Sequence, residues 1–131
     1  MENNDYVIID VGGGSDGTAA LGRYRKILEE KNAQILYVFN MYRGLSAKET
    51  AQAMSEIENA CRMKCTALVN NSNLGTMTAP ADILKSKEFE DELVNITGLD
   101  VAIRCITKQM PSLNSEDFCV ERMVRMPWEE I

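Results

Sequence analysis

The sequence predicts a three-layer α/β fold with a mostly parallel sheet, and three observations support this class. Short apolar runs rich in β-branched residues alternate with longer stretches whose apolar residues recur at helical spacing. Such alternation requires right-handed crossovers, which join parallel strands through helices. Polar residues and glycines follow the apolar runs, where open sheets of this class bind ligands. Because 131 residues are about one domain's worth, we expect a single domain over residues 1–131.

The first strand is expected at residues 6–9, Tyr-Val-Ile-Ile, because polar residues precede this apolar run and glycines follow it. An uninterrupted apolar run is typical of a strand buried on both faces. Residues 14–16 then turn the chain into a helix expected from about residue 17 to residue 31, with Asn32 as its stop. Residues 34–40, QILYVFN, predict the second strand.

A second helix is expected at residues 47–63, because Ser46 and Glu49 have the spacing of a capping box. In that motif the serine oxygen and the glutamate carboxylate satisfy the first unpaired NH groups of the helix. Its stripe of inward-facing residues is Ala51, Met54, Ile57, Glu58 and Cys61.

The remaining elements repeat the alternation of strand and helix. Residues 65–69, CTALV, predict a third strand, and residues 100–106, DVAIRCI, predict a fourth. Between them, Pro80 fits the first turn of a helix over residues 81–94 that stops near Gly98. Residues 118–124 are compatible with a short edge strand or with a helix, and Pro127 and Trp128 end that segment.

The charge and the apolar runs exclude two classes of protein. A net charge of -6 and a pI near 4.7 provide no broad cationic surface for phosphates, so nucleic-acid binding has little electrostatic support and is set aside. The apolar runs are far shorter than the roughly 20 residues of a membrane-spanning helix. The N-terminal residues MENNDY lack the basic end and the apolar core of a signal peptide, so we expect a cytoplasmic protein.

The cysteines and the absence of histidine limit the possible chemistry. Without an export signal, Cys61, Cys65, Cys105 and Cys119 are expected to be reduced thiols rather than disulfides. The spacing of Cys61 and Cys65, with no CxxC motif and no histidine, does not match a zinc site. Nucleophiles of the Ser-His and Cys-His type are excluded outright.

Asp10 and the glycines after it form the first candidate site. Asp10 ends an expected strand, a position at which a carboxylate can hold Mg²⁺, and Gly13 completes the pattern DxxG. A glycine there lets a backbone NH approach a terminal phosphate closely, because no Cβ intervenes. The alternative is an ordinary turn in which Asp10 caps the helix and the glycines supply positive φ angles.

The segment from Asn70 to Asn73 forms the second candidate site. Side-chain amides donate and accept hydrogen bonds at once, as recognition of a purine edge requires. The alternative is a turn-rich loop, since asparagine tolerates left-handed backbone geometry and Gly75 follows.

Two stretches resemble a known family. DYVIIDVGGG, residues 5–14, resembles the Walker B strand and switch segment of the MinD/ParA-type ATPases, the deviant-Walker branch of the P-loop NTPases. TALVNNSNLG, residues 66–75, is similar to the strand that ends in a base-contacting Asn in that family. The order DVGGG, GRY, NNSNLG and a closing MPW also resembles a subgroup of bacterial MinD/ParA-like ATP-binding proteins. The resemblance covers nearly the whole chain and implies an incomplete P-loop NTPase-like, Rossmann-like fold.

The resemblance implies a role for several residues. Asp10 would be the Walker B carboxylate near Mg²⁺, and Gly12 and Gly13 would lie by the phosphates of ATP. Asn70 would contact the adenine, with Asn71 as the second choice. The loop at residues 107–111 would correspond to the segment that covers the base, and no residue there matches a motif. No residue is assigned a catalytic role.

One departure from the family is as informative as the match. The phosphate loop of the family ends in Gly-Lys-Ser/Thr, and the dipeptide Gly-Lys occurs nowhere in this chain. The resemblance therefore covers only the half of the domain that starts at Walker B, and implies ATP and Mg²⁺ binding without unaided hydrolysis. Loss of the phosphate-loop strand would leave a gap in the sheet, or let residues 6–9 join residues 35–39 directly. Because open edges attract partners, we expect self-association or a second polypeptide that completes the sheet.

Two other functions remain open from the sequence. A non-catalytic interaction module would use its eight methionines and Trp128 for adaptable contacts, although methionine more often fills gaps in a core. A small-molecule enzyme would pair Asp10 with Asp16 or Asp100, but their spacing defines no such pair.

Overall fold

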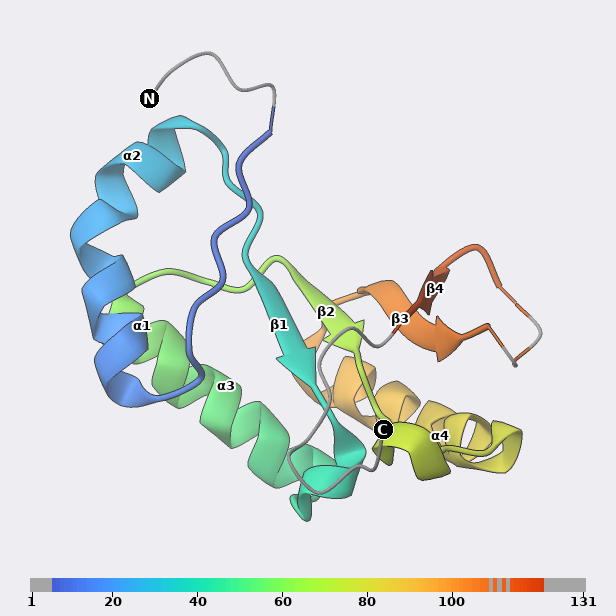
Figure 1. Cartoon of the computed structure of the whole chain (residues 1–131). Coiled ribbons are helices and arrows are strands. Elements are labelled where there is room, and N and C mark those ends of the chain that lie inside the picture. Colours follow the sequence, from blue (N-terminus) through green and yellow to red (C-terminus); the bar gives the residue numbers. More distant parts are fainter. Residues whose placement is uncertain (1–5, 109, 111, 113, 122–131) are drawn as a thin grey trace.

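The computed structural model describes residues 6–108, 110, 112 and 114–121, and it contains a four-stranded sheet in which every pairing is parallel (Figure 1). The strands lie in the order β1-β2-β3-β4. They are β1 (Leu36–Phe39), β2 (Ala67–Asn70), β3 (Val101–Thr107) and β4 (Asp117–Val120).

The predicted α/β class with its parallel sheet is thereby confirmed. So is the prediction of strands near residues 34–40, 65–69 and 100–106, and residues 117–120 take the strand alternative. Residues 122–124, Pro127 and Trp128 lie outside the described residues.

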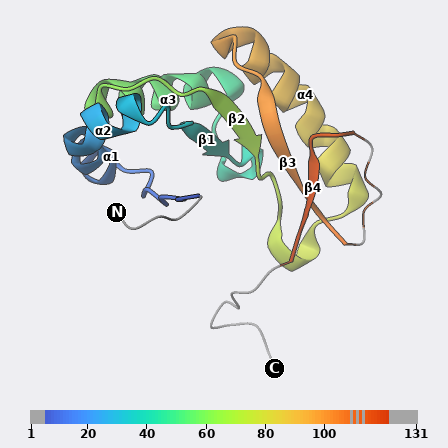
Figure 2. The ribbon, with the colours of Figure 1, turned by 90° about the horizontal axis from the view of Figure 1, so that it is seen from above.

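The helices are α1 (Ser15–Leu21), α2 (Arg25–Glu30), α3 (Ala47–Cys61) and α4 (Pro80–Thr97), with short 3-10 turns η1 (Gly22–Tyr24), η2 (Met41–Arg43) and η3 (Gly75–Met77). The two longest helices, α3 and α4, connect β1 to β2 and β2 to β3, and both lie on one face of the sheet (Figure 2). Helices α3 and α4 pack against each other, and α1 packs against α3. No helix in the described part of the chain is long and apolar enough to cross a bilayer.

The ends of the helices are where the sequence placed them in most cases. Pro80 begins α4, and Gly98 ends it with a φ of 70° that glycine adopts without strain. Asn32 follows α2 with a φ of 50°, as expected of a stop residue. The predicted helix of residues 17–31 differs in two respects, because it begins at Ser15 and a 3-10 turn at Gly22 divides it. A Cβ on Gly22 would lie 3.1 Å from the carbonyl oxygen of Cys61, so the turn lies tightly against the end of α3.

The capping box of α3 is confirmed. The backbone NH of Ser46 donates to Oε2 of Glu49 at 2.9 Å, and the backbone NH of Glu49 donates to Oγ of Ser46 at 3.2 Å. Two NH groups that would otherwise be unpaired are therefore satisfied reciprocally.

Ser46→Ala is expected to lower the free energy of unfolding by about 1 kcal/mol, because it removes the cap acceptor from α3. Urea unfolding followed by circular dichroism measures the change. Ser55→Ala, an exposed substitution within the same helix, is the matched control and should change stability by less than about 0.5 kcal/mol. Equal losses in the two variants would show that the cap contributes nothing.

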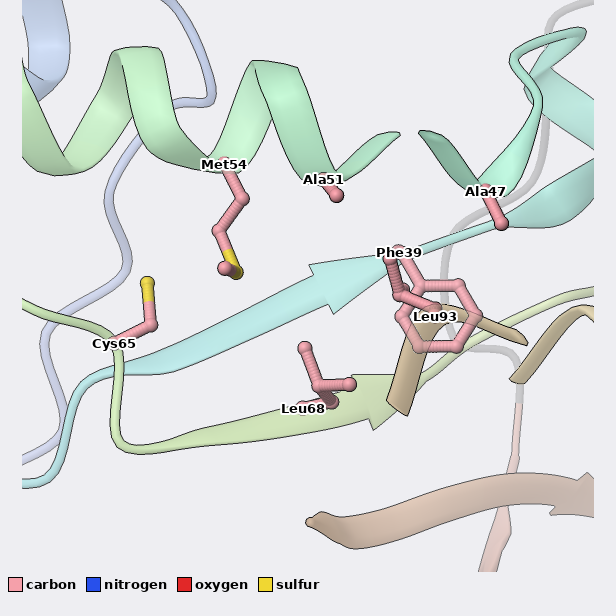
Figure 3. Close-up of a cluster of buried hydrophobic side chains, with 7 residues drawn as sticks. All are labelled: Phe39, Ala47, Ala51, Met54, Cys65, Leu68 and Leu93. Atoms are coloured by element: carbon pink, nitrogen blue, oxygen red, sulfur yellow. The ribbon is translucent and has the colours of Figure 1, made fainter. Parts of the chain in front are cut away.

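The core lies between the sheet and helices α3 and α4 (Figure 3). Leu68 of β2 and Leu93 of α4 are fully buried, and Phe39 of β1 stacks on Phe89 of α4 with ring centroids 5.7 Å apart. The other members of the cluster come from α3 and from the segment before β2, namely Ala47, Ala51, Met54 and Cys65. This one-sided core fixes which side chains of each strand face the helices.

A bulge between β2 and β3 changes that pattern at one point. Leu68 and Asn70 are two residues apart, but they pair with Val101 and Arg104, which are three apart. The extra residue lets both Val101 and Arg104 face the helices, since side chains otherwise alternate between faces. Arg104 is thereby placed beneath α4.

The prediction of a buried strand at residues 6–9 is wrong. These residues form neither a helix nor a strand, and Tyr6 and Ile8 are 92% and 95% exposed. A strand needs a neighbour for its backbone NH and carbonyl groups, but the sheet ends at β1 and no described strand lies beside this segment. Figures 1 and 2 show residues 6–14 on the side of β1 opposite β2. The direct pairing of residues 6–9 with residues 35–39 is not present in the described sheet.

Candidate functional site

The carboxyl ends of β1 and β2 carry the polar loops that form the candidate site. Phe39 and Asn70 are paired in register, so the residues after them, Asn40 and Asn71, emerge at the same edge of the sheet. The backbone NH of Asn71 donates to the carbonyl of Phe39 at 2.9 Å and continues the ladder by one bond. Both loops therefore begin side by side.

Hydrogen bonds join the two loops into one unit, which we call the frame and which consists of Asn40, Met41, Tyr42, Ser72 and Asn73. Asn40 donates from Nδ2 to the carbonyl of Asn73 at 3.2 Å, and its Oδ1 accepts from the backbone NH of Tyr42 at 3.0 Å. The backbone NH of Met41 donates to Oγ of Ser72 at 3.0 Å. Each loop thus holds the backbone of the other, which makes the edge a preorganised surface.

Asn70, the first choice for a base contact, lies inside this frame. It is 1% exposed, and its Nδ2 donates to Oε2 of Glu90 at 2.9 Å and to Oγ of Ser86 at 3.2 Å. Its Oδ1 accepts from the backbone NH of Ser72 at 3.0 Å. Both hydrogens of the amide and its oxygen therefore have protein partners, and the side chain holds the loop in place.

Asn71, the second choice, is the more accessible of the two. Its side chain is half-buried, and its Oδ1 accepts a long bond of 3.4 Å from Nδ2 of Asn73. That same Nδ2 donates to the backbone carbonyl of Asn71 at 2.9 Å, and Oδ1 of Asn73 accepts from the NH of Gly75 at 3.0 Å. Gly75 has a φ of 64°, so the turn expected from the sequence is present as well.

Asp10, Gly12 and Gly13 all lie on the surface. A Cβ placed on Gly12 or Gly13 would meet no atom within 4 Å, and neither residue is among the glycines with positive φ, which are Gly44, Gly75 and Gly98. Gly17 is different, because its Cβ would lie 2.9 Å from the carbonyl oxygen of Gly12. The turn itself therefore requires glycine at residue 17 and not at residues 12 and 13.

A resident metal ion has a weak basis in this chain. Within the described ranges, no group of three or more His, Cys, Asp and Glu side chains converges to hold an ion. Mg²⁺ commonly uses one or two carboxylates together with waters and substrate phosphates, so Asp10 fits only an ion that arrives with a nucleotide. Asp16 and Asp100, the partners considered for carboxylate chemistry, are exposed like Asp10, and Asp100 precedes β3 at the opposite edge of the sheet.

A buried ionic cluster lies directly beneath the frame and was not predicted. Arg104 of β3 donates from Nε to Oε2 of Glu90 at 2.9 Å, from Nη2 to Oε1 of Glu90, and from Nη1 to Oδ1 of Asp117 at 2.7 Å. All three side chains are at most 7% exposed, and the cluster ties α4, β3 and β4 together. The signal in the sequence was an arginine in the middle of an apolar strand, since unpaired charges are rarely buried.

The contacts of Glu90 set its ionisation. Burial by itself raises the pKa of the carboxyl, but hydrogen bonds from Arg104, Asn70 and Lys87 outweigh it and hold the pKa below the usual value. Glu90 is therefore an anion at neutral pH, and Asn70 connects this anion to the loop through Ser72.

A hollow lies elsewhere, along α3 and toward the end of α4 and the amino ends of β2 and β3. It has a volume of about 520 Å³, and Lys48, Gln52, Glu58, Cys65, Ile96 and Leu99 are among its lining residues. Burial and the neighbouring Glu58 raise the pKa of Cys65 to about 12, so its thiol stays protonated and is no nucleophile. None of the predicted site residues lines this hollow.

All four cysteines are free thiols, and Cys61 and Cys65 are buried.

Comparisons of the chain with family models, with curated proteins and with solved structures found no match.

Proposed function

We propose that this chain is a cytoplasmic nucleotide-binding domain of MinD/ParA type that binds ATP with Mg²⁺ at the carboxyl edge of its sheet. Asp10 would contact the ion, Gly12 and Gly13 would face the phosphates, and the Asn70–Asn71 loop would approach the base. When bound, Mg²⁺ supplies neutralisation of phosphate charge. The chain holds no Gly-Lys-Ser/Thr loop, so hydrolysis would require a second segment that contributes it.

The observation that carries this proposal is the pair Gly12 and Gly13. Neither the backbone conformation nor any neighbouring atom requires glycine at these two positions. A ligand that approaches the backbone closely does require it, because a Cβ would separate the NH groups from a phosphate. The ordinary-turn explanation, which relied on positive φ angles, therefore accounts less well for these residues.

The hydrogen bonds of Asn70 and Asn71 favour different roles for these two residues near the base. Asn70 would lose hydrogen bonds to Glu90, Ser86 and Ser72 if it turned toward a ligand. Asn71 would give up one long bond. We therefore assign Asn71 as the base contact in this proposal and Asn70 as the residue that positions the loop.

Mg²⁺-ATP at five times its dissociation constant is expected to stabilise the protein by about 1 kcal/mol, because it binds the folded state alone. Asp10→Ala should weaken the affinity about tenfold, since it removes the carboxylate for the ion; one factor of ten is about 1.4 kcal/mol. Thermal melts and isothermal titration measure both quantities. Asp100→Ala, an exposed carboxylate at the other edge, is the control and should bind like the parent protein. Affinity that is equally tight in Asp10→Ala would refute the assignment of Asp10.

The second candidate function is a non-catalytic interaction module that keeps the α/β scaffold. The open edge of β1 favours it, because Leu36 and Val38 are exposed there and Tyr6 to Ile9 lie exposed nearby. The methionines support this function less, since Met54, Met63 and Met110 are buried and are not available for contacts with a partner. Self-association without any stabilisation by Mg²⁺-ATP would select this function over nucleotide binding.

A further inference from the structure

Residues 6–9 are an apolar segment that has the composition of a strand and no place in the sheet. Tyr6, Val7, Ile8 and Ile9 are all more than half exposed. Aromatic and β-branched residues of this kind are the strongest strand formers. An exposed segment of this composition is a donor for pairing with a free sheet edge.

The free edge that matches it belongs to β1. The carbonyls of Ile35 and Phe39 accept bonds from the segment leading to and from β2, at Thr66 and Asn71. Because backbone groups alternate between the two sides of a strand, the NH and carbonyl groups of Leu36 and Val38 point away from β2. The edge of β1 is four residues long, as is the apolar run at residues 6–9.

The turn after the segment is held firmly at the start of α1. Thr18 is buried, and its NH and Oγ1 donate to the carbonyl of Gly14 at 3.2 and 3.0 Å. The close approach of Gly17 to the carbonyl of Gly12 compacts the same turn. Helix α1 in turn packs on α3, so this turn is fixed to the body of the protein.

We infer that two copies of this chain form a dimer by exchanging residues 6–9, each copy adding this segment as a parallel strand to the β1 edge of the other. The exchange is reciprocal, because in the described part of every copy residues 6–9 pair with no strand and the outer side of β1 carries none. It satisfies the outward backbone groups of Leu36 and Val38 and places apolar residues beside their exposed side chains. This inference deepens the self-association expected under the proposed function, and it does not require a nucleotide.

Two variants separate the donor strand from the acceptor edge. Val7→Pro with Ile8→Pro removes adjacent NH groups, so it blocks the donor in either register. Val38→Pro removes an NH that faces outward, which leaves the pairing with β2 intact. Met77→Gln changes an apolar residue that is 83% exposed, and it is the control for nonspecific hydrophobic association. Circular dichroism establishes that each variant folds.

Analytical ultracentrifugation of the 131-residue chain at tens of micromolar, without nucleotide, is expected to give twice the 14.7 kDa mass of one chain. The Met77→Gln control should remain dimeric, and both proline variants should be monomeric. A mixture of the two proline variants should recover dimers, because one supplies an intact strand and the other an intact edge. A monomeric parent chain, a dimer that survives both variants, or a mixture that stays monomeric would each overturn the exchange.

Titration of the monomeric Val38→Pro variant with Mg²⁺-ATP keeps this inference apart from the proposed function. Binding by that monomer would support the nucleotide site, whether or not the parent chain forms the exchanged dimer. A dimer with the expected variant behaviour and no ATP binding would support the exchange and refute the nucleotide site.

Discussion

Replacing Arg104 with methionine is expected to lower the free energy of unfolding by about 3–5 kcal/mol, the largest effect of any single substitution considered. Arg104 is the cation that Glu90 and Asp117 share, and its guanidinium makes bidentate contact with Glu90. Removing it leaves two carboxylates buried beneath α4, where water cannot solvate them. Urea unfolding at neutral pH measures the loss.

Arg25→Met is the matched control for this substitution. It also removes an arginine that pairs with a glutamate, but Arg25 and Glu29 are both about half exposed. Exposed pairs contribute little, so the expected change is at most about 1 kcal/mol. Similar losses in the two variants would mean that the buried cluster is no more important than a surface ion pair.

The buried cluster also predicts a dependence of stability on pH. Because Arg104 and its neighbours hold the pKa of Glu90 below its unfolded value, this carboxyl stabilises the fold fully above that unfolded value, about 4.3. The contribution is lost as the pH falls from there through the lower pKa of the folded state. In Arg104→Met, Glu90 loses the guanidinium and keeps only Lys87 as a cationic partner, so it protonates more readily and the deficit relative to the parent protein should shrink as the pH is lowered toward 5. A deficit that grows on acidification would contradict this assignment.

Leu93→Ala should cost about 3 kcal/mol, the second largest effect expected. Leu93 of α4 is fully buried against Phe39 and Leu68, so alanine leaves a cavity that the surrounding helices and sheet fill only in part. Leu84→Ala truncates a leucine in the same helix that is mostly exposed, and it should change stability by less than about 0.5 kcal/mol. Urea midpoints of the two variants measure the difference, and equal midpoints would show that the core lies elsewhere.

Most of the fold was predictable because its signals are local. The capping box at Ser46, the proline at residue 80 and the glycine at residue 98 each act on the nearest turn of backbone, so the sequence alone indicates where α3 and α4 begin or end. Residues 6–9 have an equally strong local signal for a strand. Their state depends on whether another strand lies beside them, which local sequence does not specify.

The candidate site was predictable only in outline. The sequence indicated that polar residues follow β1 and β2, and the structure brings Asn40, Asn70 and Ser72 together there. The burial of Asn70 follows from Glu90, which is twenty residues away in the chain and reaches Asn70 only because α4 packs on the sheet. Arg104 faces Glu90 because of the bulge between β2 and β3, and no residue pattern in the sequence predicted that bulge.

The most direct test of nucleotide binding at the carboxyl edge is an amide-resolved NMR titration of the ¹⁵N-labelled protein with Mg²⁺-ATP. Binding at this site is expected to shift the amide signals of Gly12, Gly13 and Asn71 with a common dissociation constant. The signals of Glu58, Cys65 and Leu99, which line the hollow near the amino ends of the strands, are expected to stay in place. Shifts confined to that hollow, or unmoved signals at Gly12 and Gly13 under saturating Mg²⁺-ATP, would contradict it.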